Sequence, residues 1–310
     1  MKRIVAFVLC AYFVVGIALL LLKDPTPDVI HILSIERPFS LLVTASDEKI
    51  AFILYLDDED CFLIDRTQIR SARLTDGSTE LALSPTAIVM EATSFERDGM
   101  VYKTFRYEFG FDGVMMTTGT LVFTDATLEL TYENDHVASY VVGDAEILFG
   151  QPGEPRYLDF TRLYGVFNIQ NGVEAVAGIV IGIDAKTGTG IELTAVDLHF
   201  PGIAASLGDA VTLTDAVDYD TVAATLLNDP EWSLVGIPKN GSIGIVDSIL
   251  LFIPIVHADR LHSATRFPVV LTYRYDGNVL TFAIDDFAFR SPLVTPEAYG
   301  EEVHAYEYRR

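Results

Sequence analysis

The chain has 310 residues, of which 50% are hydrophobic and 21% are charged. This length corresponds to about two domains of roughly 150 residues, and the apolar content excludes a disordered chain. The chain has 21 Lys and Arg residues and 44 Asp and Glu residues, which gives a formal net charge of −23. Because nucleic acids and anionic membrane surfaces attract positive charge, we expect no nucleic-acid partner and no unaided binding to anionic headgroups.

An uncharged stretch near the N-terminus, residues 4–22, is long enough to cross a membrane. As a helix rising 1.5 Å per residue it extends about 28 Å, close to the thickness of the bilayer core. Lys2 and Arg3 precede it, and this positive charge predicts a cytoplasmic N-terminus with everything after residue 23 outside. We therefore expect residues 1–23 to form a signal anchor, a single transmembrane helix that holds the protein in the cell membrane.

Two other interpretations of this segment stay open. Cleavage as a signal peptide would use the small residues Gly16 and Ala18, but it would leave four leucines at the new N-terminus, which suit a continuing membrane helix better. A lipoprotein signal would modify Cys10, but Leu9 precedes this cysteine where a small residue is required. We favour the retained helix.

The rest of the chain shows the pattern of an all-β protein. Short runs rich in Val, Ile, Thr, Phe and Tyr alternate with clusters of Asp, Gly, Asn and Pro at intervals of about 8–15 residues. Residues 101–109 place Val101 and Phe105 on one face and Tyr102 and Thr104 on the other, and residues 266–275 alternate in the same way. Asp-Gly pairs at 76–77, 98–99, 112–113 and 276–277, and Asn-Gly pairs at 171–172 and 240–241, are typical of tight hairpin turns. We predict an antiparallel, sandwich-like, hairpin-rich ectodomain.

Glycine and proline between residues 150 and 156 interrupt the strand pattern, so we place a boundary there. The predicted units are β domain 1, residues 28–149, and β domain 2, residues 157–310. One short ectodomain helix is expected after Asp220, with Pro230 ending it. The apolar run 242–257 contains Asp247 and Pro254, so we predict buried strands there and not a second membrane span. A short helix start is expected at Thr295.

Few residues suggest a catalytic or metal-binding role. Asp57, Asp58, Glu59 and Asp60 form an acidic turn after residue 56 that could bind calcium, but the turn lacks the spacing of a known calcium loop, so a solvated turn is the favoured interpretation. Asp285 and Asp286 repeat this feature in a weaker form. The six histidines are scattered, and His257 and His262 lack the spacing of a zinc pair. The sequence therefore nominates no catalytic, cofactor-binding or metal-ligating residue.

The two cysteines offer no disulfide, because Cys10 falls in the membrane segment and Cys61 lies outside it. Cys61 is interpreted as a strand residue or as a reactive thiol, and its acidic neighbours disfavour the reactive thiolate.

These observations lead us to expect a membrane-anchored extracytoplasmic binding or accessory protein that acts with a protein partner in the cell envelope. One alternative is a cell-envelope hydrolase of the glycosidase type, which would use two carboxylates. Another is a structural surface component that associates with its own copies through exposed strand edges. The sequence does not decide whether the protein is an enzyme, and we favour a non-catalytic role.

Overall fold

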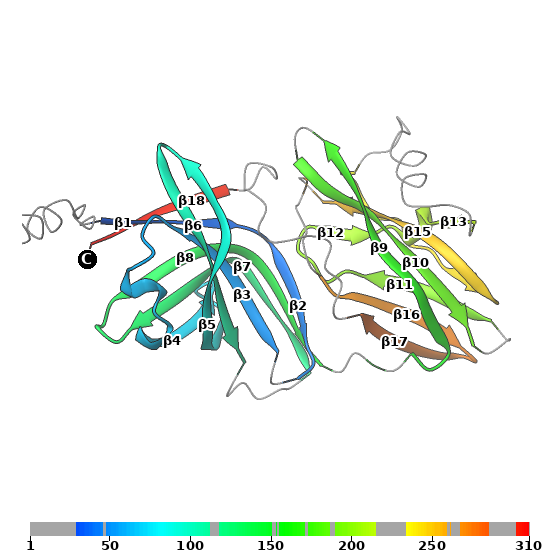
Figure 1. Ribbon diagram of the computed structural model, residues 1–310. Helices are drawn as coiled ribbons and strands as arrows, with labels where there is room; N and C mark the ends of the chain where they lie inside the picture. Colours follow the sequence, from blue (N-terminus) through cyan, green and yellow to red (C-terminus); the bar gives the residue numbers. More distant parts are fainter. Residues whose placement is uncertain are drawn as a thin grey trace, which may run out of the picture.

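The computed structural model describes residues 29–45, 48–111, 118–150, 153, 155–170, 173–186, 190–214, 234–258, 261, 267–284 and 302–309. Within these ranges the chain forms 18 β-strands in three sheets and three short 3-10 helices (Figure 1). The all-β prediction is confirmed, and nearly all strand pairs are antiparallel, the parallel pair of β2 and β8 being an exception. No helix in the described part of the chain has the length and apolar character that a membrane crossing requires. The predicted membrane segment, the helix expected after Asp220 and the helix start expected at Thr295 lie outside these residues.

The first sheet has nine strands in the order β18-β1-β3-β6-β5-β4-β7-β8-β2. Their bounds are β1 (Val29–Glu36), β2 (Phe39–Val43), β3 (Lys49–Leu56), β4 (Ile69–Thr75), β5 (Glu80–Arg97), β6 (Met100–Gly110), β7 (Gly119–Tyr132), β8 (Val137–Phe149) and β18 (Glu302–Arg309). A corner at Arg37 separates β1 from β2, and the Arg37 backbone N–H donates a hydrogen bond to the Val142 carbonyl of β8 (2.9 Å). The sheet therefore curls until β1 and β18, at one end, lie beside β8 near the other end, and it encloses a core. We call this sheet and its core the first unit.

Aromatic side chains fill much of this core. Two of them make hydrogen bonds to the connection between β3 and β4. The hydroxyls of Tyr107 and Tyr132 both donate to the carbonyl of Leu63, at 3.1 and 3.2 Å. Leu63 lies in the 3-10 helix η1 (Phe62–Ile64), which is followed by η2 (Arg66–Gln68). Burial raises the pKa of both tyrosines, so the hydroxyls keep their protons and remain donors.

The second unit, formed by the described residues between 155 and 284, has two sheets packed face to face. One has the order β12-β15-β10-β9, with β13 also paired to β15, and the other has the order β14-β11-β16-β17. The bounds are β9 (Leu158–Gln170), β10 (Val173–Ala185), β11 (Ile191–Asp197), β12 (Ile203–Ala205), β13 (Val211–Leu213), β14 (Ile243–Ile245), β15 (Ser248–His257), β16 (Val269–Tyr275) and β17 (Asn278–Ile284), with η3 (Leu207–Asp209) after β12. Ile179 and Ile253 from one sheet and Leu193 and Leu271 from the other share one buried core. This packing forms a sandwich, and the strands predicted in 242–257 and 266–275 are confirmed.

The last strand returns to the first unit. β18 pairs with β1 along its whole length, from Val29 opposite Arg309 to Glu36 opposite Glu302. Tyr306 and Tyr308 of β18 pack against the core of the first unit. The prediction assigned residues 302–309 to domain 2, residues 157–310. In the structure, β18 pairs with β1, the first strand of the first unit.

Three predicted hairpin turns are found at Asp-Gly pairs, where the backbone takes positive φ as these turns require. They are the turns at 76–77, 98–99 and 276–277, in which Gly77, Gly99 and Gly277 have φ of 85°, 77° and 76°. The pair at 240–241 is different, because Gly241 packs closely on Gly208 in a loop before β14 and joins no hairpin. The pairs at 112–113 and 171–172 lie outside the described residues.

The predicted alternation in residues 101–109 is wrong at its start. Val101 is exposed, whereas Tyr102 is buried. Tyr102 packs with Leu33, Ile35 and Tyr55 in a small cluster separate from the main core of the first unit. The simple rule of one buried face fails here because this sheet buries side chains on both faces.

Candidate metal centre on strands β1 and β18

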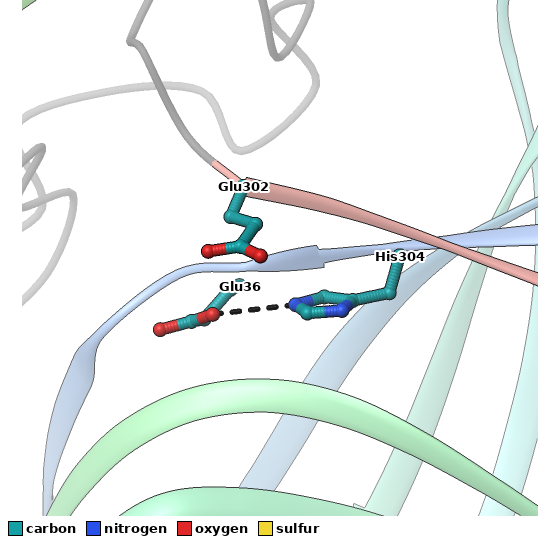
Figure 2. A group of neighbouring side chains, drawn as sticks. All are labelled: Glu36, Glu302 and His304. Carbon is teal, nitrogen blue, oxygen red and sulfur yellow. Dashed lines mark hydrogen bonds and ion pairs between the residues drawn. The ribbon is translucent and has the colours of Figure 1, made fainter.

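Within the described ranges, one group of three side chains has the composition and spacing of a metal site. Glu36 of β1 and Glu302 and His304 of β18 each offer a ligand atom, and these atoms all lie within 4.8 Å of one another. Figure 2 shows the two carboxylates and the imidazole turned toward a common point. Glu36 Oε2 lies 3.2 Å from His304 Nε2. The arrangement combines oxygen and nitrogen ligands, as many divalent-metal sites do.

The register of the two strands accounts for this grouping. Glu36 is directly opposite Glu302, and Ser34 is directly opposite His304. Because side chains two residues apart share a face of a strand, Glu302 and His304 lie on the face that carries Tyr306 and Tyr308 toward the core. The side chains of His304 and Glu36 are 26% and 17% exposed, so the group lies at the rim of the core and remains reachable from solvent.

A polar connection continues from this group along the same face. The Val141 backbone N–H of β8 donates to the Tyr306 hydroxyl (2.8 Å), and Ser34 Oγ donates to the Val141 carbonyl (2.7 Å). The two hydroxyls of Ser34 and Tyr306 are 3.3 Å apart. β18 therefore joins β1 to β8 at the place where the first sheet closes.

The opposite face of the same strand pair carries a second histidine. His31 Nδ1 lies 2.6 Å from Asp57 Oδ2, and its Nε2 lies 3.9 Å from Glu307 Oε1. The His31 backbone N–H also donates to Asp57 Oδ1 (2.9 Å). Asp57 is the first residue of the predicted calcium turn, and Asp58 Oδ1 accepts a hydrogen bond from the Asp60 backbone (3.0 Å). The solvated turn stays the favoured interpretation and calcium binding the alternative, and two carboxylates of the turn already have partners within the protein.

Cys61 lies in this turn and not in a strand, so its interpretation as a strand residue is wrong. It precedes η1, is 6% exposed, and its thiol donates to the Asp58 carbonyl (3.6 Å). Of the histidine pair considered for zinc, His257 is fully buried with Nε2 2.9 Å from the Val176 carbonyl. His262, Asp285 and Asp286 lie outside the described residues.

A further histidine connects the two units. His199, which follows β11, has its Nδ1 2.8 Å from Glu146 Oε1 of β8. The hydrogen bond to Glu146 raises the pKa of His199, and Asp197 contributes in the same direction. Leu42 and Leu148 of the first unit form an apolar cluster with Val270 and Ala283 of the second unit beside it. A cavity of about 220 Å³ opens at this junction, with His199, Leu148 and Val270 in its lining.

Glu36, Glu302 and His304 could not be recognised as a group from the sequence, and the reason is physical. Val303 and Ala305 alternate with His304 and Tyr306, which is a period-two strand signal. This signal was not used, because a short helix was expected to begin at Thr295 in the same stretch. The third ligand, Glu36, lies 268 positions before His304, and local patterns carry no information about such a pairing.

Neither the models of known protein families nor the curated proteins contain a match to this chain.

Proposed function

We propose that this protein is a membrane-anchored extracytoplasmic binding or accessory protein. Residues 1–23 would anchor it, the first unit would stand next to the membrane, and the second unit would meet a protein partner in the cell envelope. The proposal combines the apolar N-terminal segment with the path of the chain in the folded part.

The observation that carries the proposal is the pairing of Val29 with Arg309, which brings the two ends of the folded part together. Five residues separate residue 23 from Val29. The six steps between these two positions span at most about 3.6 Å each, so the start of β1 would lie within roughly 22 Å of the membrane. In Figure 1 this end of the β1–β18 pair lies on the far side of the first unit from the second unit. The second unit would therefore extend away from the anchor.

The charge of the chain agrees with this orientation. A formal net charge of −23 repels anionic headgroups, so the folded part would be held off the membrane to which it is tethered. Exposed apolar side chains on the second unit, such as Ile237 at 88% and Val279 at 60%, would then face outward and be available to a partner.

Site-specific photocrosslinking in intact cells tests the binding role. A photoreactive residue at Ile237 or Val279 should give a crosslink to a different protein, whereas one at Val137 of β8, which is also exposed, serves as the control in the first unit. The absence of a crosslink from both Ile237 and Val279, with the chain intact in the membrane, would contradict the proposal.

The alternative of a structural surface component gives a different result in the same experiment. Crosslinks would then join copies of this chain, and the size of the detergent-solubilised protein would increase with its concentration as exposed strand edges pair. A heterologous crosslink with a concentration-independent size supports the accessory role.

A further inference from the structure

We propose that Glu36, Glu302 and His304 form a binding site for a divalent transition-metal ion of the zinc type, and that the ion fastens the last strand to the first. The site is a property of the folded part and does not depend on the function proposed above.

The donor set selects the class of ion. An imidazole nitrogen favours zinc and its neighbours in the first transition row, whereas calcium and magnesium prefer oxygen ligands alone. Three protein ligands, two carboxylates and one imidazole, leave at least one position of a four-coordinate zinc ion for water. Zn²⁺ is therefore the ion to which this set corresponds best.

The distances agree with a shared ion. Two ligands that each lie about 2.0–2.1 Å from zinc at a tetrahedral angle are separated by about 3.3 Å. Glu36 Oε2 and His304 Nε2 are 3.2 Å apart. The third ligand, a Glu302 oxygen, lies within 4.8 Å of both, and because Glu302 is exposed its side chain has room to turn toward a shared ion.

The electrostatics of the strand pair point to a cation independently of these distances. Glu36 and Glu302 are directly opposite each other in the register, and like charges at such positions destabilise an antiparallel pair. Glu302 pairs with Glu36 through the backbone, but its side chain makes no hydrogen bond or ion pair with the other residues that the structure describes. In a chain with a net charge of −23, a bound divalent ion would turn this repulsion into attraction across the two strands.

The placement of the ligands links metal binding to the fold. Since 268 positions separate Glu36 from His304, the ligands come together only when β18 is paired with β1. An ion that binds the folded state and not the unfolded chain stabilises the folded state by mass action. We therefore expect the ion to protect the C-terminal strand in particular.

The test uses the full chain in detergent, stripped of metal by a chelator and then titrated with Zn²⁺. The wild-type protein should bind one Zn²⁺ ion per chain, and its thermal midpoint should rise by about 5 °C at a concentration of about one hundred times Kd. Digestion by carboxypeptidase, which removes residues from the C-terminus, should slow at least tenfold. Ca²⁺ at the same concentration should give neither effect.

Two variants remove ligands. His304→Ala should weaken Zn²⁺ binding at least tenfold, and Glu302→Gln, at an exposed position, should do the same while leaving the metal-free midpoint close to that of the wild type. The matched control is Glu307→Gln, which changes a glutamate of the same strand on the opposite face and should bind Zn²⁺ as the wild type does. Absence of Zn²⁺ binding in the wild type, or undiminished binding in Glu302→Gln, would overturn the proposal even if His304→Ala does not fold. An equal response to Ca²⁺ would also overturn it, because it would show a general carboxylate site.

Discussion

Two buried hydroxyls share one acceptor in the core of the first unit. Tyr107 and Tyr132 both donate to the Leu63 carbonyl, so the turn between β3 and β4 is held against the core from two strands. A buried carbonyl that keeps one of two donors remains satisfied, whereas one that loses both is left without a partner. The two tyrosines should therefore act as a coupled pair.

This coupling gives a first prediction. Tyr132→Phe and Tyr107→Phe should each lower the free energy of unfolding by about 1 kcal/mol, and the double variant should lose more than the sum of the two. Urea denaturation of the four proteins measures the coupling. Strictly additive losses would show that the shared carbonyl is not the reason for the arrangement.

A second prediction concerns the histidine between the two units. The pKa of His199 is raised in the folded state, mainly by its hydrogen bond to Glu146. The stabilisation from this contact is therefore fully present below the unfolded pKa of about 6.5 and is lost as the pH rises through the higher folded pKa. Glu146→Gln should lower the thermal midpoint at pH 6 by about 2–4 °C and have a much smaller effect at pH 9.

The control for this experiment is Glu96→Gln, an exposed glutamate on the β5–β6 hairpin, which should change the midpoint equally little at both pH values. A Glu146→Gln effect that is the same at pH 6 and pH 9 would mean that the charge on His199 does not contribute to the contact.

At the level of the elements, the closure of the first sheet depends on a close approach between β8 and the corner after β1. Gly143 has φ of 98°, and a Cβ atom added there would lie 2.9 Å from the backbone nitrogen of Arg37. That nitrogen donates to the neighbouring Val142 carbonyl, so it has little freedom to move. Gly77 has a similar φ of 85° in the β4–β5 turn but meets nothing within 4 Å.

This pair of glycines gives a third prediction. Both Gly143→Ala and Gly77→Ala place an alanine at positive φ, which costs about 1 kcal/mol. Only Gly143→Ala also pushes the backbone of β8 away from the backbone of Arg37. We expect Gly143→Ala to cost about 1–3 kcal/mol more than Gly77→Ala in the free energy of unfolding. Equal losses in the free energy of unfolding would show that the backbone at Arg37 moves away from β8 at little energetic cost.

The hydroxyl of Tyr306 gives a fourth prediction, because it accepts the hydrogen bond of the Val141 backbone N–H. Tyr306→Phe keeps the ring and removes the acceptor, which should cost about 1–3 kcal/mol. Hydrogen exchange at the Val141 amide, compared between the wild type and Tyr306→Phe, checks this directly. Unchanged protection would show that another acceptor serves this amide.

The elements also show how far the sequence could predict the fold. Strands such as β16 (Val269–Tyr275) follow from alternation and from Asp-Gly turns, because both signals are local. The pairing of β1 with β18 and the parallel pairing of β2 with β8 join distant parts of the chain, and no local pattern records them. The candidate metal ligands depend on the first of these pairings, so they could be found only in three dimensions. Cys61 shows the same limit on a smaller scale, since the apolar residues that follow it, Phe62–Ile64, resemble a strand in composition but form a 3-10 helix.

In the whole molecule, both ends of the folded part lie in the first unit, at a distance from the second unit (Figure 1). The contact between His199 and Glu146 and the apolar cluster around Leu148 join the two units. A protein built in this way, with an anchor before Val29, would present the second unit to the space outside the membrane.

Cysteine labelling in intact cells tests this central claim most directly. Ile237→Cys introduces a thiol at a site that is 88% exposed in the second unit, whereas the native Cys61 is 6% exposed and serves as an internal control in the wild type. A membrane-impermeant maleimide should label Ile237→Cys in intact cells and leave the wild type unlabelled, with the labelled protein recovered in the membrane fraction. Labelling of Ile237→Cys only after the cells are lysed would contradict the proposed location.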